Sequence, residues 1–156
     1  MPDFFSYGGA PAPAPERAGP RAILADLSGD DWEKFIGYAA RRRYPAGALI
    51  VEAGATDRAL CFVASGQVEL ATAGAARKAP RALRGEGEVF GILSFLDAAP
   101  SEITATVSTA GPAELLLLTP EALQQLAAWQ PRIAMALLRD LGAHVAARLR
   151  RLQPGD

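Results

Sequence analysis

Several features are scarce or missing in this sequence of 156 residues, and each of these absences argues against a class of protein. With Cys61 as its one cysteine, a single chain can form neither a disulfide framework nor a multi-cysteine zinc or iron–sulfur site. No run approaches the roughly 18 uninterrupted apolar residues of a membrane span. The N-terminus lacks a basic stretch followed by an apolar one, which argues against a secretory signal.

The net charge is also small, at −1. A nucleic-acid-binding chain usually has a basic excess or a clustered basic face, so the overall charge does not support that class. No Walker-type glycine loop and no nucleophile beside a histidine occur. His144 is expected to be a surface or interface residue, and Cys61 is expected to be a buried thiol. We therefore expect a soluble, cytoplasmic protein that is not an enzyme and has no metal or cofactor.

Residues 1–20 differ in composition from the rest of the chain. The segment APAPAP favours an extended polyproline conformation and cannot continue a helix or a central strand. Phe4, Phe5 and Tyr7 precede it. Two interpretations remain open: a flexible tail, or an arm whose aromatic side chains dock on a partner.

The folded part is expected to begin with a short helix. Ser28 is a candidate N-cap with Asp31 three residues later, and an apolar face follows at Trp32, Phe35, Ile36 and Ala39. Arg41–Arg43 are expected to close this helix, where cations suit the negative end of the helix dipole. A nucleic-acid patch is the alternative interpretation of the three arginines.

Residues 44–118 have the pattern of short β-strands separated by glycine, as in a sandwich or barrel. Leu60–Ala64 and Gln67–Ala71 flank Ser65-Gly66, which predicts a hairpin. Thr104–Val107 and Glu114–Leu118 predict two further strands. The second of these ends in four consecutive leucines, which favours burial on both faces.

The C-terminal part predicts two helices. Thr119-Pro120-Glu121 combines an N-cap, a proline at the first helical position and an acidic first turn, and a second helix is expected from Pro131. Its apolar residues recur mostly at steps of three and four: Ile133, Leu137, Leu138, Leu141, Val145, Leu149 and Leu152. Such a stripe packs on its own barrel or on a second chain. We favour a homodimer or partner interface anchored by Leu137, Leu141, Val145 and Leu149.

Two stretches resemble the cyclic-nucleotide-binding domain family, which includes the sensor domains of catabolite-activator-type regulators. They are YPAGALIVEAGATDRALCFVASGQVEL, and GEGEVFGILSFL followed by ATV, the second being similar to the family's ligand cassette. The resemblance extends from about Ile23 to Leu152. It implies a mainly β fold with flanking helices: a β jelly roll within residues 21–130, followed by a long C-terminal helix over residues 131–152.

In that family the cassette has three parts. A glycine opens a short helix whose N–H groups face the cyclic phosphate, a glutamate after it holds the ribose, and an arginine pairs with the phosphate. The resemblance places Gly91 at the glycine and Ile92 at the glutamate. The arginine position falls on Ser101 or Ile103, depending on how a loop two residues longer is aligned.

The charge around the cassette argues against an anionic ligand. No Lys or Arg occurs between Arg84 and Arg132, whereas six acids do: Glu86, Glu88, Asp97, Glu102, Glu114 and Glu121. Losing a buried charge partner costs about 2–5 kcal/mol. Ser94 and Thr104 are left as neutral hydrogen-bonding groups for some other ligand, or as residues that bond only locally.

We therefore expect a regulatory module that acts through protein–protein contacts, with cyclic-nucleotide binding lost. Two alternatives stay open: a small-molecule sensor with an altered pocket, and the sensor fragment of a transcription regulator. Many members of this fold carry a helix-turn-helix after the long helix, and the four residues after Leu152 leave no room for one. For these 156 residues we expect no DNA and no membrane partner.

Overall fold

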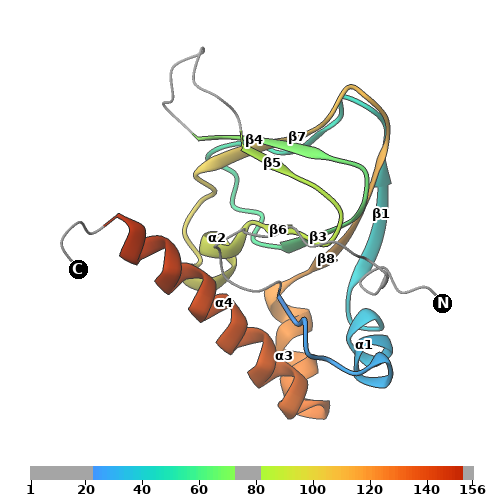
Figure 1. Ribbon diagram of the computed structural model, residues 1–156, viewed down its shortest axis with the longest axis vertical. Helices are drawn as coiled ribbons and strands as arrows, with labels where there is room; N and C mark the ends of the chain where they lie inside the picture. Colours follow the sequence, from blue (N-terminus) through green and yellow to red (C-terminus); the bar gives the residue numbers. More distant parts are fainter. Residues whose placement is uncertain (1–22, 73–81, 153–156) are drawn as a thin grey trace.

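The protein consists of a roll of β-strands with helices gathered at one end (Figure 1). The computed structural model describes residues 23–72 and 82–152. In chain order its elements are α1 (Gly29–Ile36), β1 (Ala40–Tyr44), β2 (Leu49–Val51), β3 (Leu60–Ser65), β4 (Val68–Thr72), β5 (Ala82–Arg84), β6 (Val89–Phe90), α2 (Ile92–Asp97), β7 (Ile103–Val107), β8 (Ala113–Leu118), α3 (Pro120–Trp129) and α4 (Pro131–Arg151).

Within the described residues, two antiparallel sheets of four strands each form the roll. Their strand orders are β1-β8-β3-β6 and β2-β7-β4-β5. Side chains from both sheets meet in an inter-sheet cluster made of Cys61, Val63, Val68, Leu70, Phe90, Ala105 and Leu115. The prediction of a mainly β jelly roll with flanking helices and a long C-terminal helix is confirmed.

A second apolar cluster joins the helices to the roll, and we call it the helical core. It contains Phe62, Leu116 and Leu118 from the strands, together with residues of all four helices. Trp32 stacks on Phe35 at 5.1 Å between ring centroids, and Phe35 meets the edge of Phe62 at 5.3 Å. Figure 1 shows α1, α3 and α4 together at this end of the molecule.

The strand β8 lies between these two clusters, which explains its run of leucines. Leu115 faces the inter-sheet cluster, and Leu116 and Leu118 face the helical core. All three side chains are fully buried, so the predicted burial on both faces is confirmed. The predicted helix starts are also confirmed, because the Ser28 and Thr119 hydroxyls accept the N–H groups of Asp31 and Ala122.

The prediction of a hairpin at Ser65-Gly66 is wrong. β3 pairs with β8 and β6, whereas β4 pairs with β5 and β7, so the chain passes from one sheet to the other at this turn. Gly66 has a φ of +88°, and a Cβ there would lie 2.5 Å from the carbonyl oxygen of Pro112. A tight glycine turn serves a hairpin and a sheet-to-sheet crossing equally well, and the sequence does not distinguish them.

The prediction that Arg41–Arg43 close the first helix is also wrong. α1 ends at Ile36, and the three arginines lie in β1, which pairs with β8 over its whole length. β1 is at the edge of its sheet. Exposed charges on an edge strand oppose pairing with another chain, and Arg41 also forms an ion pair with Glu114 at 3.1 Å.

The crossing at Gly66 gives a test of the fold. We expect Gly66→Ala to destabilise the protein by roughly 2 kcal/mol or more, because it adds both a left-handed φ for alanine and a backbone clash. Urea unfolding measures the change. Gly111→Ala is the matched control, since a Cβ at Gly111 meets nothing within 4 Å. Equal midpoints for the two variants would contradict the crossing geometry.

Candidate functional site

The segment from Gly91 to Val107 forms a short helix, a loop and a strand. Gly91 is the N-cap of α2 with a φ of +83°. A Cβ at this position would lie 2.9 Å from the carbonyl oxygen of Ala59, so glycine is required here for conformation and for space. The glycine opening that the sequence indicates is therefore present.

Ile92 follows Gly91, and its side chain is 4% exposed. It belongs to the helical core with Val89, Phe95 and Leu141. The side chain offers neither a charge nor a hydrogen bond to a ligand. The first turn of α2 also contains no acidic residue.

The hydroxyl groups of Ser101 and Thr104 are used by the protein itself. Ser101 Oγ donates to the carbonyl oxygen of Ile103 at 2.8 Å and accepts the Ile103 N–H at 3.1 Å. Thr104 Oγ1 accepts the N–H of Ala53 at 3.0 Å. Ser94 is buried in α2, and its carbonyl oxygen accepts the N–H of Ala98.

The two candidates for the arginine position thus have structural roles. Ile103 is partly buried and packs against the inter-sheet cluster. The Ser101 backbone binds residues 54 and 55 on both sides, donating to Ala55 and accepting from Gly54. These contacts hold the loop after α2 against the segment after β2. Neither position supplies a cation.

The interface residues expected on the last helix separate into two groups. Leu137 and Leu141 are 0% exposed and belong to the helical core of the same chain, so they are not available as surface anchors. Val145 is partly buried against that core, and Leu149 is 52% exposed. The sequence spacing combined two faces of α4 into one stripe. Phe4, Phe5 and Tyr7 lie outside the described residues.

A second apolar face of α4 is exposed, and we call it the outer seam. It consists of Met135, Leu138, Gly142, Val145, Leu149 and Leu152, at successive steps of three, four, three, four and three residues. Met135 is 62% exposed and Leu152 is 75% exposed. This is the a/d spacing of a coiled coil. These alternating steps can be read from the sequence, but the stripe predicted from it did not include Met135 or Gly142.

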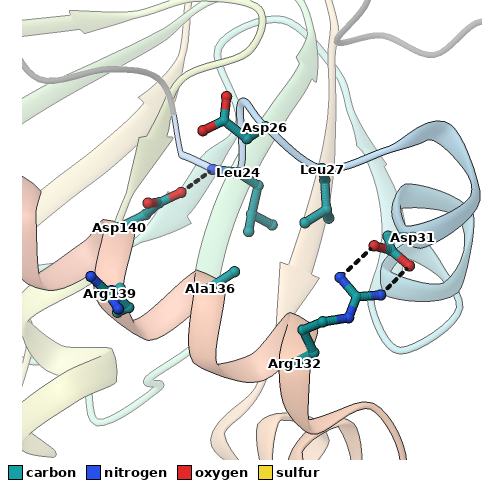
Figure 2. A pocket seen from close by; sticks show the side chains of 8 residues that line it. All are labelled: Leu24, Asp26, Leu27, Asp31, Arg132, Ala136, Arg139 and Asp140. Carbon is teal, nitrogen blue, oxygen red and sulfur yellow. Dashed lines mark hydrogen bonds and ion pairs between the residues drawn. The ribbon is translucent and has the colours of Figure 1, made fainter.

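A cavity of about 260 Å³ lies between the segment before α1 and the first half of α4 (Figure 2). Asp140 Oδ2 accepts the N–H of Leu24 at 2.7 Å. Leu24 has a φ of +61°, which is unusual for a residue other than glycine, and this bond helps to hold it. Across the cavity the guanidinium of Arg132 binds Asp31. The Asp140 carboxylate therefore attaches the segment before α1 to α4, and the Asp31 carboxylate attaches α1 itself to α4.

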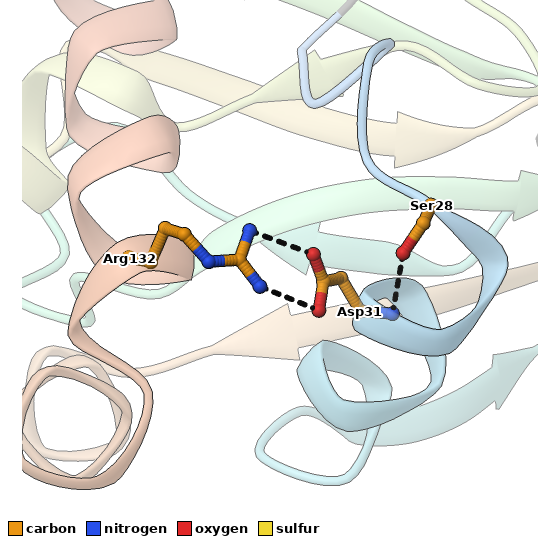
Figure 3. A network of polar contacts seen from close by, with 3 residues as sticks. All are labelled: Ser28, Asp31 and Arg132. Carbon is orange, nitrogen blue, oxygen red and sulfur yellow. Dashed lines mark hydrogen bonds and ion pairs between the residues drawn. The ribbon is translucent and has the colours of Figure 1, made fainter.

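The contact between Asp31 and Arg132 uses both carboxylate oxygens (Figure 3). Arg132 Nη2 donates to Oδ1 at 2.9 Å, and Nη1 lies 2.8 Å from Oδ2. The hydrogen bond from Arg132 lowers the pKa of the Asp31 carboxyl below its ordinary value of 3.8. Arg132 thus links the N-terminus of α4 to α1, which neither residue's place in the sequence indicated.

The cysteine thiol is buried between the sheets, and burial raises the pKa of Cys61 to about 12. The thiol therefore stays protonated and unreactive at neutral pH. In the part of the chain that the structure describes, no group of three or more His, Cys, Asp or Glu side chains is placed to hold a metal ion. No helix within residues 23–72 and 82–152 has the length and apolar character to cross a membrane.

Known proteins resemble this chain over most of its length. The model of the cyclic nucleotide-binding domain matches residues 41–128. The cyclic AMP receptor protein of Thermus thermophilus is 35% identical over 129 residues, which cover 82% of this chain and 57% of that protein. The crystal structure of the Thermus thermophilus catabolite activator protein superposes with a TM-score of 0.71 at 33% identity, covering 81% of this chain and 57% of that one.

Glutaminase 2 of Bradyrhizobium diazoefficiens is also similar, at 30% identity over 131 residues. The match covers 84% of this chain but 20% of that protein. The chain therefore spans between a fifth and just over half of the length of these curated relatives.

The ion pair between Asp31 and Arg132 gives a prediction of pH dependence. Because the pKa of Asp31 is lowered in the folded chain, the pair's stabilisation is present above pH 3.8 and is lost as the pH falls below that value. We expect Asp31→Asn to melt at a lower temperature than the unmodified chain at pH 7, and the difference to shrink below about pH 4.

Thermal unfolding followed by circular dichroism from pH 7 to pH 2.5 checks this prediction. Asp30→Asn is the matched control, since Asp30 is the exposed neighbouring carboxylate in α1. A difference for Asp31→Asn that stayed constant throughout the acid range would show that the ion pair does not shape the pH dependence.

Proposed function

This chain belongs to the cyclic nucleotide-binding domain family, and from that membership we propose that it is a non-catalytic regulatory module that has lost ordinary cyclic-nucleotide binding and acts through protein–protein contacts. The observation that carries the proposal is the chemistry of the cassette. Gly91 retains the glycine opening, whereas Ile92, Ser101 and Ile103 stand where the ligand's polar partners are expected. The cassette is retained here as part of the fold.

The energetic argument concerns the phosphate. A cyclic phosphate carries a negative charge that must be paired when it leaves water. Within residues 85–131 the sequence has no Lys or Arg to pair with it. Losing such a partner costs about 2–5 kcal/mol, which turns a micromolar site into one of roughly 30 µM to several millimolar. Binding at cellular concentrations is not expected.

The outer seam of α4 supports a homodimer as the protein–protein contact. The helix already uses one face in the helical core. The seam leaves a second apolar face that is exposed at Met135, Leu138, Leu149 and Leu152 and is partly covered by the core at Val145. Heptad spacing lets two identical helices pack side by side, with Gly142 giving space for close approach near the middle. We propose a parallel pairing of two α4 helices, with Leu138, Val145 and Leu149 as the central contacts.

The alternative function is a sensor domain that binds a small molecule in an altered pocket. The similarity to a cyclic AMP receptor protein favours it, and so does the length of the relatives, in which the matching region is part of a longer protein. The match to Glutaminase 2 covers a fifth of that protein, and we keep the prediction that this chain is not itself an enzyme.

Titration calorimetry separates the proposed function from the alternative. We expect neither cyclic AMP nor cyclic GMP to bind this chain with a dissociation constant below about 30 µM, because the phosphate has no cation in the cassette. The cyclic AMP receptor protein of Thermus thermophilus, titrated with cyclic AMP under the same conditions, is the comparison. Tighter binding of either nucleotide to this chain would overturn the proposed loss.

The dimer is tested by a charge placed in the outer seam. We expect the unmodified chain to be a dimer in light scattering at tens of micromolar. Leu149→Lys removes two leucines from each dimer, one from each chain, and each buried leucine contributes about 1.5–3 kcal/mol. The variant is therefore expected to associate roughly 10² to 10⁴-fold more weakly. Leu83→Lys is the matched control, because Leu83 and Leu149 are 53% and 52% exposed. A monomeric unmodified chain, or a Leu149→Lys variant that stays dimeric, would rule out the seam.

A further inference from the structure

The cavity between the segment before α1 and the first half of α4 has charged groups at both ends and apolar side chains between them (Figure 2). Its α4 side is formed by four residues at steps of four, three and one, a spacing that places them on one face of the helix. They are Arg132, Ala136, Arg139 and Asp140. The outer seam uses other positions of α4, so a dimer formed through the seam does not use these four residues.

Only part of the charge that lines the cavity is compensated within the chain. At one end, Arg132 Nη1 and Nη2 lie 2.8 Å and 2.9 Å from the two carboxylate oxygens of Asp31. At the other end, Asp140 Oδ2 accepts the N–H of Leu24 at 2.7 Å. A backbone N–H carries no net charge, so this bond does not compensate the Asp140 carboxylate. Within residues 23–72 and 82–152, Asp140 Oδ1 has no hydrogen bond or ion pair.

Arg139 lines the cavity beside Asp140 and is its second guanidinium group. Its side chain is exposed. Over the part of the chain that the structure describes, this guanidinium has neither a hydrogen bond nor an ion pair, either with Asp140 or with another carboxylate. This end of the cavity therefore presents one positive and one negative group, and each can still bind a ligand group of the opposite sign.

The middle of the cavity is apolar. Leu24 is 6% exposed, and Leu27 and Ala136 are partly buried. Figure 2 shows the Leu24 side chain between the Asp140 end and the Arg132 end, above Ala136. The φ of +61° at Leu24 is held in part by the bond to Asp140, and backbone strain of this kind is concentrated at binding and active sites.

The charges of the lining argue against a simple ion as the ligand. Three carboxylates and two guanidinium groups give a formal charge of −1: Asp26, Asp31, Asp140, Arg132 and Arg139. Asp26 already has an interaction of its own. An inorganic anion is repelled by the excess of carboxylates, and a simple amine leaves Arg139 without a partner. A ligand that carries both signs satisfies Arg139 and Asp140 together.

We propose that this cavity binds a free α-amino acid with an apolar side chain. The ligand's carboxylate accepts hydrogen bonds from the Arg139 guanidinium, and its ammonium group donates to Asp140. Its side chain lies against Leu24, Leu27 and Ala136. An α-amino acid has both charges on groups attached to one carbon atom, which suits two adjacent residues of one helix.

The size of the cavity agrees with so small a ligand. Its volume of about 260 Å³ is below the roughly 300–1,000 Å³ of pockets for drug-sized ligands. The lining residues lie apart from Ile92, Ser101 and Ile103 in the cassette. The site goes beyond the proposed function, which does not depend on it, and the cyclic-nucleotide titration is decided separately.

L-leucine is the probe, titrated calorimetrically into the full chain at about 50 mM salt, where screening of charges is weak. We expect a dissociation constant below about 1 mM. Arg139→Gln and Asp140→Asn are each expected to weaken binding about tenfold or more, because each removes a charge-assisted hydrogen bond. Asp140→Asn keeps an oxygen that can accept the Leu24 N–H, and thermal unfolding verifies that both variants remain folded.

Arg150→Gln is the matched control, since Arg150 is another exposed arginine of α4 and does not line the cavity. We expect its affinity for L-leucine to change less than about twofold, because Debye screening leaves little long-range effect of one surface charge. Equal losses for Arg139→Gln and Arg150→Gln, or a dissociation constant above about 1 mM for the unmodified chain, would overturn the proposal.

Two analogues of leucine test the need for both charges without any variant. Isocaproate lacks the ammonium group, and isopentylamine lacks the carboxylate. Each is expected to bind about tenfold or more weakly than L-leucine, because each leaves one charged group of the cavity without a partner. If either analogue binds as tightly as L-leucine, the cavity does not recognise an amino acid. This comparison decides the question even where Asp140→Asn fails to fold.

Discussion

The packing of α4 against the outer side of the first sheet is the constraint on which the rest of the structure depends. Leu137 and Leu141 are fully buried there together with strand residues Leu116 and Leu118. Because this face is occupied within the chain, the orientation of the helix is fixed, and Met135, Leu138 and Leu149 of the outer seam remain exposed. Arg132 fixes the start of the helix to α1, and Asp140 fixes the segment before α1 to the helix.

Much of the fold could be predicted from local sequence signals. Glycine spacing, the caps at Ser28 and Thr119 and the leucines of β8 each depend on a few neighbouring residues, and each indicated the right element. The errors concern partners that are far apart in the sequence. The local sequence at Ser65-Gly66 does not indicate that β3 and β4 belong to different sheets. The sequence around Arg41–Arg43 does not indicate that these residues form a strand paired with β8.

The candidate sites divide in the same way. The departure of the cassette from its family could be seen in the residue types alone, since Ile92 has no polar atom in its side chain. That the Ser101 and Thr104 hydroxyls are occupied by backbone groups required the structure. The two faces of α4 differ by about a third of a turn, and apolar spacing alone merged them.

Gln130 joins α3 to α4, and a tilt of α4 about this junction would displace its far end the most. The helix has 21 residues and is therefore about 32 Å long, but the residues fully buried in the helical core lie in its first half. A tilt of about 10° around the Gln130–Pro131 end would move the far end by roughly 5 Å. Such a displacement is about as long as one turn of helix, so a tilt at the Arg132 end would have its largest effect at Leu152.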